Sequence, residues 1–259
     1  MDVRVRGSVP PTPFLSARDL VETEYDLSLP VEVRVRTDPD ERTWAAHYDD
    51  RHVLNISRQA ATSAMARELA LHEFAHMVRH EEAHPSHTQS TDEALFLALS
   101  GRSVERRKLA HCYQIANHMK DIYADDITLT VGPTRKLVSF LESKLAAAVA
   151  DRPGEPPSGA MTAVRDGGFS RRSPAADPEI TAVNAAFALA LVERHDLVGA
   201  DHRIYDLAHA AARDAEEIDL STFKRRFETL SQDTDESTYR KALVDVTRDY
   251  VVGPAQAAD

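Results

Sequence analysis

Two histidines and a glutamate stand close together in the stretch ARELALHEFAHMVRHE, which spans residues 66–81. His72, Glu73 and His76 form an HExxH motif. In an α-helix, residues four positions apart lie one turn above each other on the same face. His72 and His76 can therefore offer two imidazole nitrogens to one Zn²⁺, with Glu73 beside them to act on a metal-bound water. The motif predicts a zinc site with these two histidines as ligands.

The residues around the motif favour a helix. No Gly or Pro interrupts the chain between residues 59 and 84, and apolar residues recur there at helical spacing. These apolar positions are Met65, Leu69, Phe74, Met77 and Val78. We therefore expect one helix to carry both histidines on a single face.

A catalytic zinc site takes three protein ligands and keeps one position open, and the sequence offers two candidates for the third ligand. Glu93 follows His76 by 17 residues and stands at the expected start of a helix. Asp121 lies on a later helix, with Asp125 four residues on and therefore on the same face. Negative charges near the expected end of that helix, at about residue 127, oppose its macrodipole, which favours a role for Asp121. Glu93 stays open as the alternative.

The HExxH motif followed by Asp121-x-x-Ala124-Asp125 resembles the zincin metallopeptidases of the gluzincin type, which pair HExxH with an E-x-x-x-D helix. The resemblance covers about residues 30–130. It implies that Asp121 is the third zinc ligand and that Asp125 lies behind a zinc-binding histidine and orients it. Asp121 stands where Glu is usual in that family. The whole chain also resembles an uncharacterised archaeal, largely haloarchaeal, protein family, a resemblance that implies no activity.

These residues together predict a zinc-dependent metallopeptidase with one Zn²⁺ per chain and a peptide or protein substrate. Glu73 is the expected general base, taking a proton from a zinc-bound water and passing it to the leaving amine. His118, Tyr123 or Arg107 is the expected donor to the oxyanion, and the sequence does not choose among them. The alternative is a non-catalytic metal-binding or helical partner-binding protein with a degenerate zincin fold. Glu73 favours the enzyme, because a scaffold would not need it.

The chain before the motif predicts a small sheet. Residues 30–36 alternate between apolar and charged side chains, which indicates a strand. Residues 43–48 and 52–56 flank a polar turn and predict a hairpin, so we expect a few antiparallel strands ahead of the motif helix. A short helix is expected over residues 14–25 with Ser16 as its N-cap, and residues 1–13 as a loose segment or an edge strand.

The chain after the motif predicts helices. The expected segments are residues 93–100, 104–127, 137–150, 178–195, 201–215, 221–231 and 235–250, with a strand or an extended exit at 128–131. Residues 151–178 are rich in Pro, Gly and Ser and predict a linker or a long loop. The expected fold is α+β, with a zincin-like domain of small sheet and HExxH helix at residues 1–150 and a mainly helical region at residues 179–252.

Composition limits the partners. The chain of 259 residues carries a formal charge of −11, which argues against nucleic acid and against anionic membranes. Cys112 is the single cysteine, so no disulfide framework and no cysteine-based zinc site is expected. The first residues contain no apolar signal region, and no stretch is long and apolar enough to span a membrane. We therefore expect a cytoplasmic protein, and its oligomeric state stays open.

Overall fold

The computed structural model describes residues 1–39, 41–151 and 177–252, so the expected linker lies almost wholly outside the described residues. The chain divides into two compact units. The first joins Met1–Val138 to Thr229–Val251, and the second takes Ser139–Glu228. The architecture is α+β, with one small sheet and a helical C-terminal region, as the sequence predicted.

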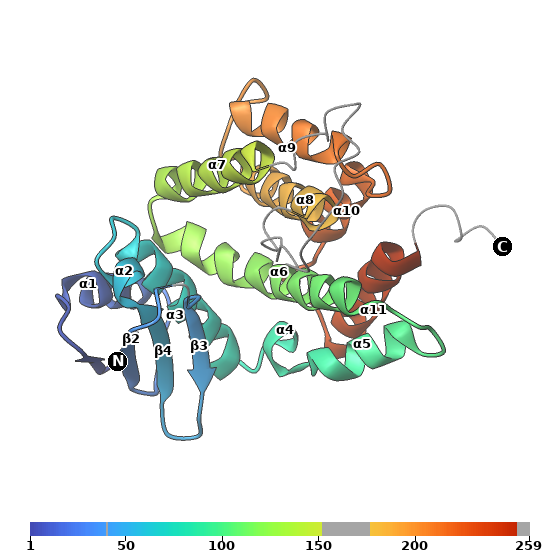
Figure 1. Cartoon of the computed structure of the whole chain (residues 1–259). Helices are drawn as coiled ribbons and strands as arrows, with labels where there is room; N and C mark the ends of the chain where they lie inside the picture. Colours follow the sequence, from blue (N-terminus) through green and yellow to red (C-terminus); the bar gives the residue numbers. More distant parts are fainter. Residues whose placement is uncertain (40, 152–176, 253–259) are drawn as a thin grey trace, which may run out of the picture. The chain divides into compact units, whose positions relative to one another are not determined.

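The sheet in the first unit has four strands in the order β1-β2-β4-β3 (Figure 1). They are β1 (Val3–Arg6), β2 (Val31–Arg36), β3 (Trp44–His47) and β4 (His52–Ser57). The β3–β4 hairpin is antiparallel, which confirms that prediction, and β1 is an edge strand. The expectation of an antiparallel sheet is wrong for the other pairs, because β1 pairs with β2 and β2 with β4 in parallel. Helix α1 (Thr12–Val21) returns the chain between β1 and β2, as a parallel connection requires.

Helix α1 begins earlier than predicted. Its N-cap is Pro11, so Ser16 lies inside the helix and is not the cap. Pro13 falls in the first turn, where the missing N–H of proline removes no helical hydrogen bond. The predicted helix, which began at residue 14, left this proline outside, whereas it is part of the helix.

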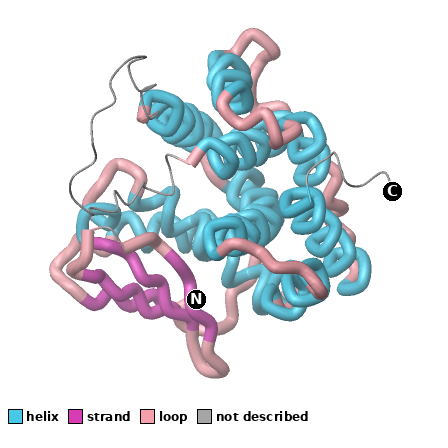
Figure 2. The backbone as a smooth tube through the Cα atoms, turned by 45° about the vertical axis from the view of Figure 1, so that its right-hand side comes forward, coloured by secondary structure: helices cyan, strands magenta, loops and turns pink. Residues whose placement is uncertain are grey.

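The core of the first unit lies between the sheet and helices α1 and α3 (Ala66–Glu81). Val33 and Leu54 contribute from the sheet, Phe14 from α1 and Phe74 from α3, all with no exposed surface. Figure 2 shows the strands lying side by side as one sheet next to the helices. The predicted HExxH helix is confirmed, and it packs against β3 and β4.

A tight turn ends α3 and reverses the chain. Ala83 has a φ of 50°, the left-handed conformation that closes many helices. The Ala83 amide donates to the carbonyl of His80, and the His84 amide donates to the carbonyl of Arg79. Because these bonds form a Schellman motif, the chain turns back along α3 and enters the short helix α4 (Pro85–Thr88).

Two further helices follow, α5 (Thr91–Leu99) and α6 (Arg106–Val131). Residues 128–131 belong to α6, so the expected strand or extended exit there is wrong. Gly132 ends the helix, and a Cβ at this position would lie 2.6 Å from Cδ2 of Leu71. Asp121 therefore lies ten residues before the end of α6, beyond the last turn where the macrodipole acts, and the dipole argument for its role does not apply.

Helix α11 (Glu236–Val252) belongs with the first unit, apart from its last residue. The sequence-based division at residue 179 grouped it with the preceding helices instead. Its buried face finds partners on α6: the Tyr239 ring lies 5.9 Å from the Tyr123 ring, and the Tyr250 hydroxyl bonds to His111. A domain boundary drawn only from sequence composition could not show this return of the chain.

The second unit is helical and includes most of α7 (Thr134–Ala150). Its other helices are α8 (Pro178–Arg194), α9 (Arg203–Arg213) and α10 (Leu220–Glu228), close to the predicted segments. Helix α8 is buried on nearly all sides and packs against both α9 and α10. None of the helices in the described ranges has the length and hydrophobicity that a membrane span requires.

Candidate metal centre

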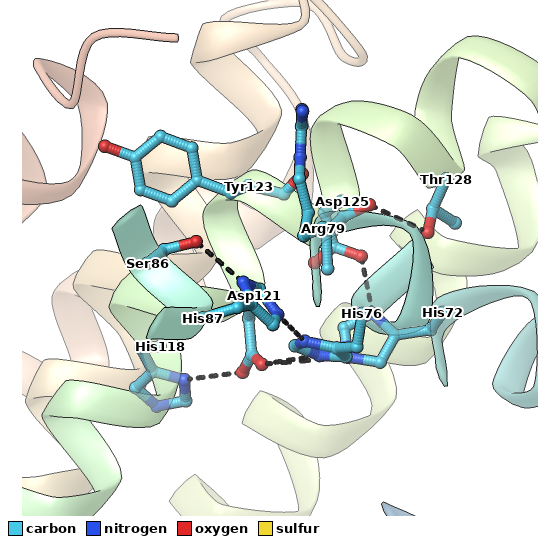
Figure 3. Close-up of polar contacts among 11 residues, drawn as sticks. His72, His76, Arg79, Ser86, His87, His118, Asp121, Tyr123, Asp125 and Thr128 are labelled. Atoms are coloured by element: carbon cyan, nitrogen blue, oxygen red, sulfur yellow. Dashed lines mark hydrogen bonds and ion pairs between the residues drawn. The ribbon is translucent and has the colours of Figure 1, made fainter. Parts of the chain in front are cut away.

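His72 and His76 on α3 meet Asp121 on α6 (Figure 3). The two Nε2 atoms lie 3.1 Å apart. Oδ1 of Asp121 lies 3.3 Å from Nε2 of His76 and 3.7 Å from Nε2 of His72. Each side chain keeps part of its surface exposed, so a ligand can reach the group. The structure thus brings together the three residues that the sequence proposed as metal ligands.

Asp125 determines which nitrogen of His72 carries the proton. Its side chain is 5 % exposed, and Oδ1 lies 2.8 Å from Nδ1 of His72. A carboxylate accepts hydrogen bonds, so His72 donates from Nδ1. The lone pair of Nε2 then points toward His76 and Asp121. This is the supporting role that the sequence predicted for Asp125.

A second chain of hydrogen bonds determines the tautomer of His76. The backbone amide of Ser86 donates to Nδ1 of His84, so this nitrogen is an acceptor. The Ser86 hydroxyl, 2.8 Å from the same nitrogen, must therefore also donate to it. The hydroxyl is then an acceptor for Nδ1 of His87, 2.7 Å away, which makes His87 a donor at that nitrogen.

The same chain of hydrogen bonds ends at His76, a candidate metal ligand. Because Nδ1 of His87 carries its proton, Nε2 of His87 is an acceptor. It lies 2.8 Å from Nδ1 of His76, which must therefore donate to it. Nε2 of His76 is left with a lone pair that faces His72 and Asp121. Both histidines of the motif thus hold the tautomer that binds a metal through Nε2.

The donor set fits a divalent transition metal. Two imidazole lone pairs and one carboxylate oxygen lie within 4.8 Å of one another, and this is the ligand chemistry that zinc prefers. Burial alone would lower the pKa of His72, yet Asp125 and Asp121 raise that pKa well above its usual value. The cluster therefore attracts positive charge, and a metal ion would supply it.

Glu73 lies beside this group in a place suited to proton transfer. Glu73 is 7 % exposed, and burial raises the pKa of its carboxyl group. It lines a cleft of about 570 Å³ together with His72, His76 and Asp121. A carboxylate with a raised pKa can both accept a proton and return it.

One face of α6 and the edge strand β3 form the walls of this cleft. The residues from α6 follow helical spacing and are Gln114, Asn117, His118, Lys120 and Asp121. Those from β3 and the loop before it are Arg42, Thr43, Trp44, Ala45 and His47, and His87 completes the lining. The sheet edge and the candidate metal centre therefore share one cavity.

The three expected oxyanion donors lie in different places. His118 lines the cleft, with Nδ1 3.5 Å from Oδ2 of Asp121. Tyr123 is fully buried, and its ring points away from Asp121 (Figure 3). Arg107 is exposed in the first turn of α6, about 21 Å along the helix from Asp121. The structure thus brings His118 to the site and leaves Tyr123 and Arg107 outside the lining of the cleft.

Glu93, the alternative third ligand, lies elsewhere. It is exposed in the first turn of α5 and does not line the cleft. The Ser90 hydroxyl accepts a hydrogen bond from the Glu93 amide, which is half of an S-x-x-E capping box. Glu93 therefore has a structural reason for its position, at the N-terminus of a helix.

His47 is a cleft residue that the sequence did not reveal. Nε2 of His52 lies 3.0 Å from the Glu81 carboxylate and must donate to it, so Nδ1 of His52 accepts from Nδ1 of His47. His47 keeps an unprotonated Nε2, and burial lowers its pKa to about 3. His80 follows His76 by four residues on α3. Its ring stacks on the His47 ring, with the ring centroids 4.1 Å apart, and it does not join His72, His76 and Asp121.

Two more cleft residues were missed, His87 and Lys120. The alternation of β3 could have placed His47 on a definite face, but no local signal points to His87, because a turn of the chain brings it to α3.

No curated protein and no solved structure matches the chain. Residues 1–252 match the family described as "Family of unknown function (DUF5781)", and the chain belongs to that family.

Proposed function

We propose that the protein is a zinc-dependent metallopeptidase with a zincin-like first unit. One observation carries the proposal: three electron-pair donors converge, and the protons of both histidines are held on the far side of each ring. Donor atoms at such distances need a cation between them, which is either a metal ion or the second proton that the raised pKa of His72 indicates. Zinc is the metal that fits two imidazoles and a carboxylate best.

Each residue of the cleft has its own role in the proposed hydrolysis of a peptide bond. His72, His76 and Asp121 would hold the zinc ion. Zn²⁺ bound there would make a water molecule more acidic and polarise the scissile carbonyl. Glu73 would accept a proton from water at its carboxylate and deliver that proton to the leaving amine. His118, beside Asp121, is the remaining candidate donor to the developing oxyanion.

The free edge of β3 supports a peptide as the substrate. It is the last strand of the sheet, and its residues line the cleft. Backbone groups on the outer side of an edge strand can hold an extended peptide as an added strand. Trp44 is 45 % exposed on this strand and offers an apolar surface to a substrate side chain.

Metal content tests the site itself. We expect one zinc per chain in wild type by elemental analysis, and loss of that zinc in His76→Ala and in Asp121→Ala. Glu93→Ala, a matched loss of a carboxylate outside the cleft, should keep its zinc. Absence of zinc from wild type after incubation with the metal would overturn the proposal.

Glu73→Gln separates an enzyme from a non-catalytic metal-binding protein. The amide cannot take up a proton, so hydrolysis of an unstructured protein substrate should fall by about 100-fold or more. Zinc content should stay at the wild-type level, because Glu73 is not a ligand. Equal hydrolysis by wild type and this variant would remove Glu73 as the base.

A further inference from the structure

Lys120 places a positive charge in the cleft. It directly precedes Asp121 on α6, so the Cα atoms of the two residues are about 3.8 Å apart. Its side chain lines the same cavity as Glu73, His72, His76 and Asp121. His47 of β3 and His87 of α4 line the cavity with it.

Among the described residues, Lys120 has no hydrogen-bond or ion-pair partner. Two carboxylates are near enough to act on it, those of Asp121 and Asp92. Asp121 faces His72, His76 and His118, and Asp92 accepts a hydrogen bond from the Tyr113 hydroxyl. Neither forms an ion pair with the Lys120 ammonium.

A half-buried ammonium without a counter-charge is costly, because burial removes water from it. Arg42 adds a second cation to the lining of the cleft; it is exposed to water and lacks an ion-pair partner among the described residues. The chain as a whole carries a charge of −11, so two unpaired cations in one cavity run against the general composition. A negatively charged ligand would supply the counter-charge that the half-buried Lys120 lacks, and Arg42 could assist it from the exposed side of the cleft.

We propose that Lys120, with Arg42 at the mouth of the cleft, binds a carboxylate of the substrate close to the scissile bond. The inference rests on the proposed function and names its substrate class: peptides with a negative charge within about two residues of the cleaved bond, given a rise of about 3.4 Å per residue in an extended chain. The carboxylate belongs to the free C-terminus or to an Asp or Glu side chain.

Peptide binding to the zinc-loaded Glu73→Gln variant tests this without catalysis. The probes are alanine-rich peptides with a neutral fluorophore: one amidated, one with a free C-terminus, and amidated versions with a single Glu or Gln at each position. We expect a Glu peptide or the free carboxylate peptide to bind about ten-fold more tightly than its neutral match. The preference should weaken as salt rises.

Adding Lys120→Met should abolish that preference and leave binding of the neutral peptides unchanged. Lys241→Met is the matched control, since Lys241 pairs with Asp245 on α11 and does not line the cleft. A preference for the peptide with a free C-terminus would identify the C-terminal carboxylate as the bound group, and a preference for a Glu peptide would identify a side-chain carboxylate.

Three results would overturn the inference. Equal binding of acidic and neutral peptides would do so while leaving the proposed function intact, provided that zinc is bound. An equal loss of affinity for all peptides in Lys120→Met would show that Lys120 does not select charge. Failure of every peptide to bind to the zinc-loaded protein would overturn the peptidase proposal as well.

Discussion

At the scale of single residues, the two histidines of the HExxH motif are supported in different ways. His72 donates to a carboxylate, Asp125, the arrangement that the motif resemblance implied. His76 donates to a third histidine, His87, whose own tautomer depends on Ser86 and His84. Because a backbone amide anchors this chain, the orientation of His76 depends on a turn that lies outside the motif.

His87→Ala should therefore weaken zinc binding. Loss of such a supporting partner typically reduces metal affinity by about 10- to 100-fold. Competition with a chelator of known affinity measures this, and ¹⁵N chemical shifts of the imidazoles should show that the Nδ1–H tautomer of His76 is no longer held. His80→Ala is the control, since His80 contacts His47 and lies outside both chains of hydrogen bonds. Equal zinc affinity of wild type and His87→Ala would contradict the assignment.

At the scale of elements, the end of α3 is joined to the sheet by one carboxylate. Glu81 accepts hydrogen bonds from the amide and hydroxyl of Ser28, the amide of Leu29, and Nε2 of His52. Burial alone would raise the pKa of Glu81, but the hydrogen bonds outweigh it and lower that pKa. This contact fixes α3, and so the motif, against β4 and the loop before β2.

Glu81→Gln should lower the free energy of unfolding at neutral pH by about 1–3 kcal/mol, because four donors lose a charged acceptor. The sign of the pH dependence follows from the lowered pKa. The contribution of Glu81 is complete above its unfolded pKa, near 4.5, and is lost as pH falls through the lower folded value. The difference between wild type and variant in urea unfolding should therefore shrink in acid.

Glu24→Gln provides the comparison, since Glu24 is exposed. Its difference from wild type should be small and should change little over the same pH range. A Glu81→Gln difference that grew in acid would contradict the assigned role.

At the scale of the whole molecule, the first unit is completed by a helix that lies more than 100 residues further along the chain than α6. Tyr239 of α11 is fully buried against Tyr123, and Arg240 donates to the side chain of Gln89. Arg248 donates to the carbonyls of Leu97 and Ala98 at the end of α5. Helices α5 and α6, which follow the HExxH helix, are therefore held in part by the C-terminal segment.

Tyr239→Ala should destabilise the protein by about 3 kcal/mol or more, because it leaves a cavity beside α6. Tyr239→Phe is the matched control: the hydroxyl is buried without a hydrogen-bond partner among the described residues, so its removal should be neutral or stabilising. Thermal unfolding of the full chain measures both. A stable Tyr239→Ala protein would show that α11 does not complete the first unit.

The sequence alone determined the elements and the centre of the site. Periodicity predicted the motif helix, the hairpin, and the four helices after residue 177, because each depends on contacts a few residues apart. The i, i+4 spacing placed His72 and His76 on one face, and the same rule grouped Asp121 with Asp125. These inferences needed only the geometry of a helix.

Tertiary structure decided what depends on distant segments. The packing of α6 on α3 brings Asp121, and not Glu93, to the two histidines, and the dipole argument that favoured Asp121 proved inapplicable. The parallel pairing of β1 with β2 depends on the path of α1, and that of β2 with β4 on the placement of β3 at the edge of the sheet, neither of which the alternation of side chains shows. His47 reaches the cleft because it lies on the β3–β4 hairpin, and His87 because the chain reverses after α3. Lys120 lies on the side of α6 that lines the cleft. Such contacts between distant residues are determined by the packing of helices and strands, and no local sequence pattern predicts them.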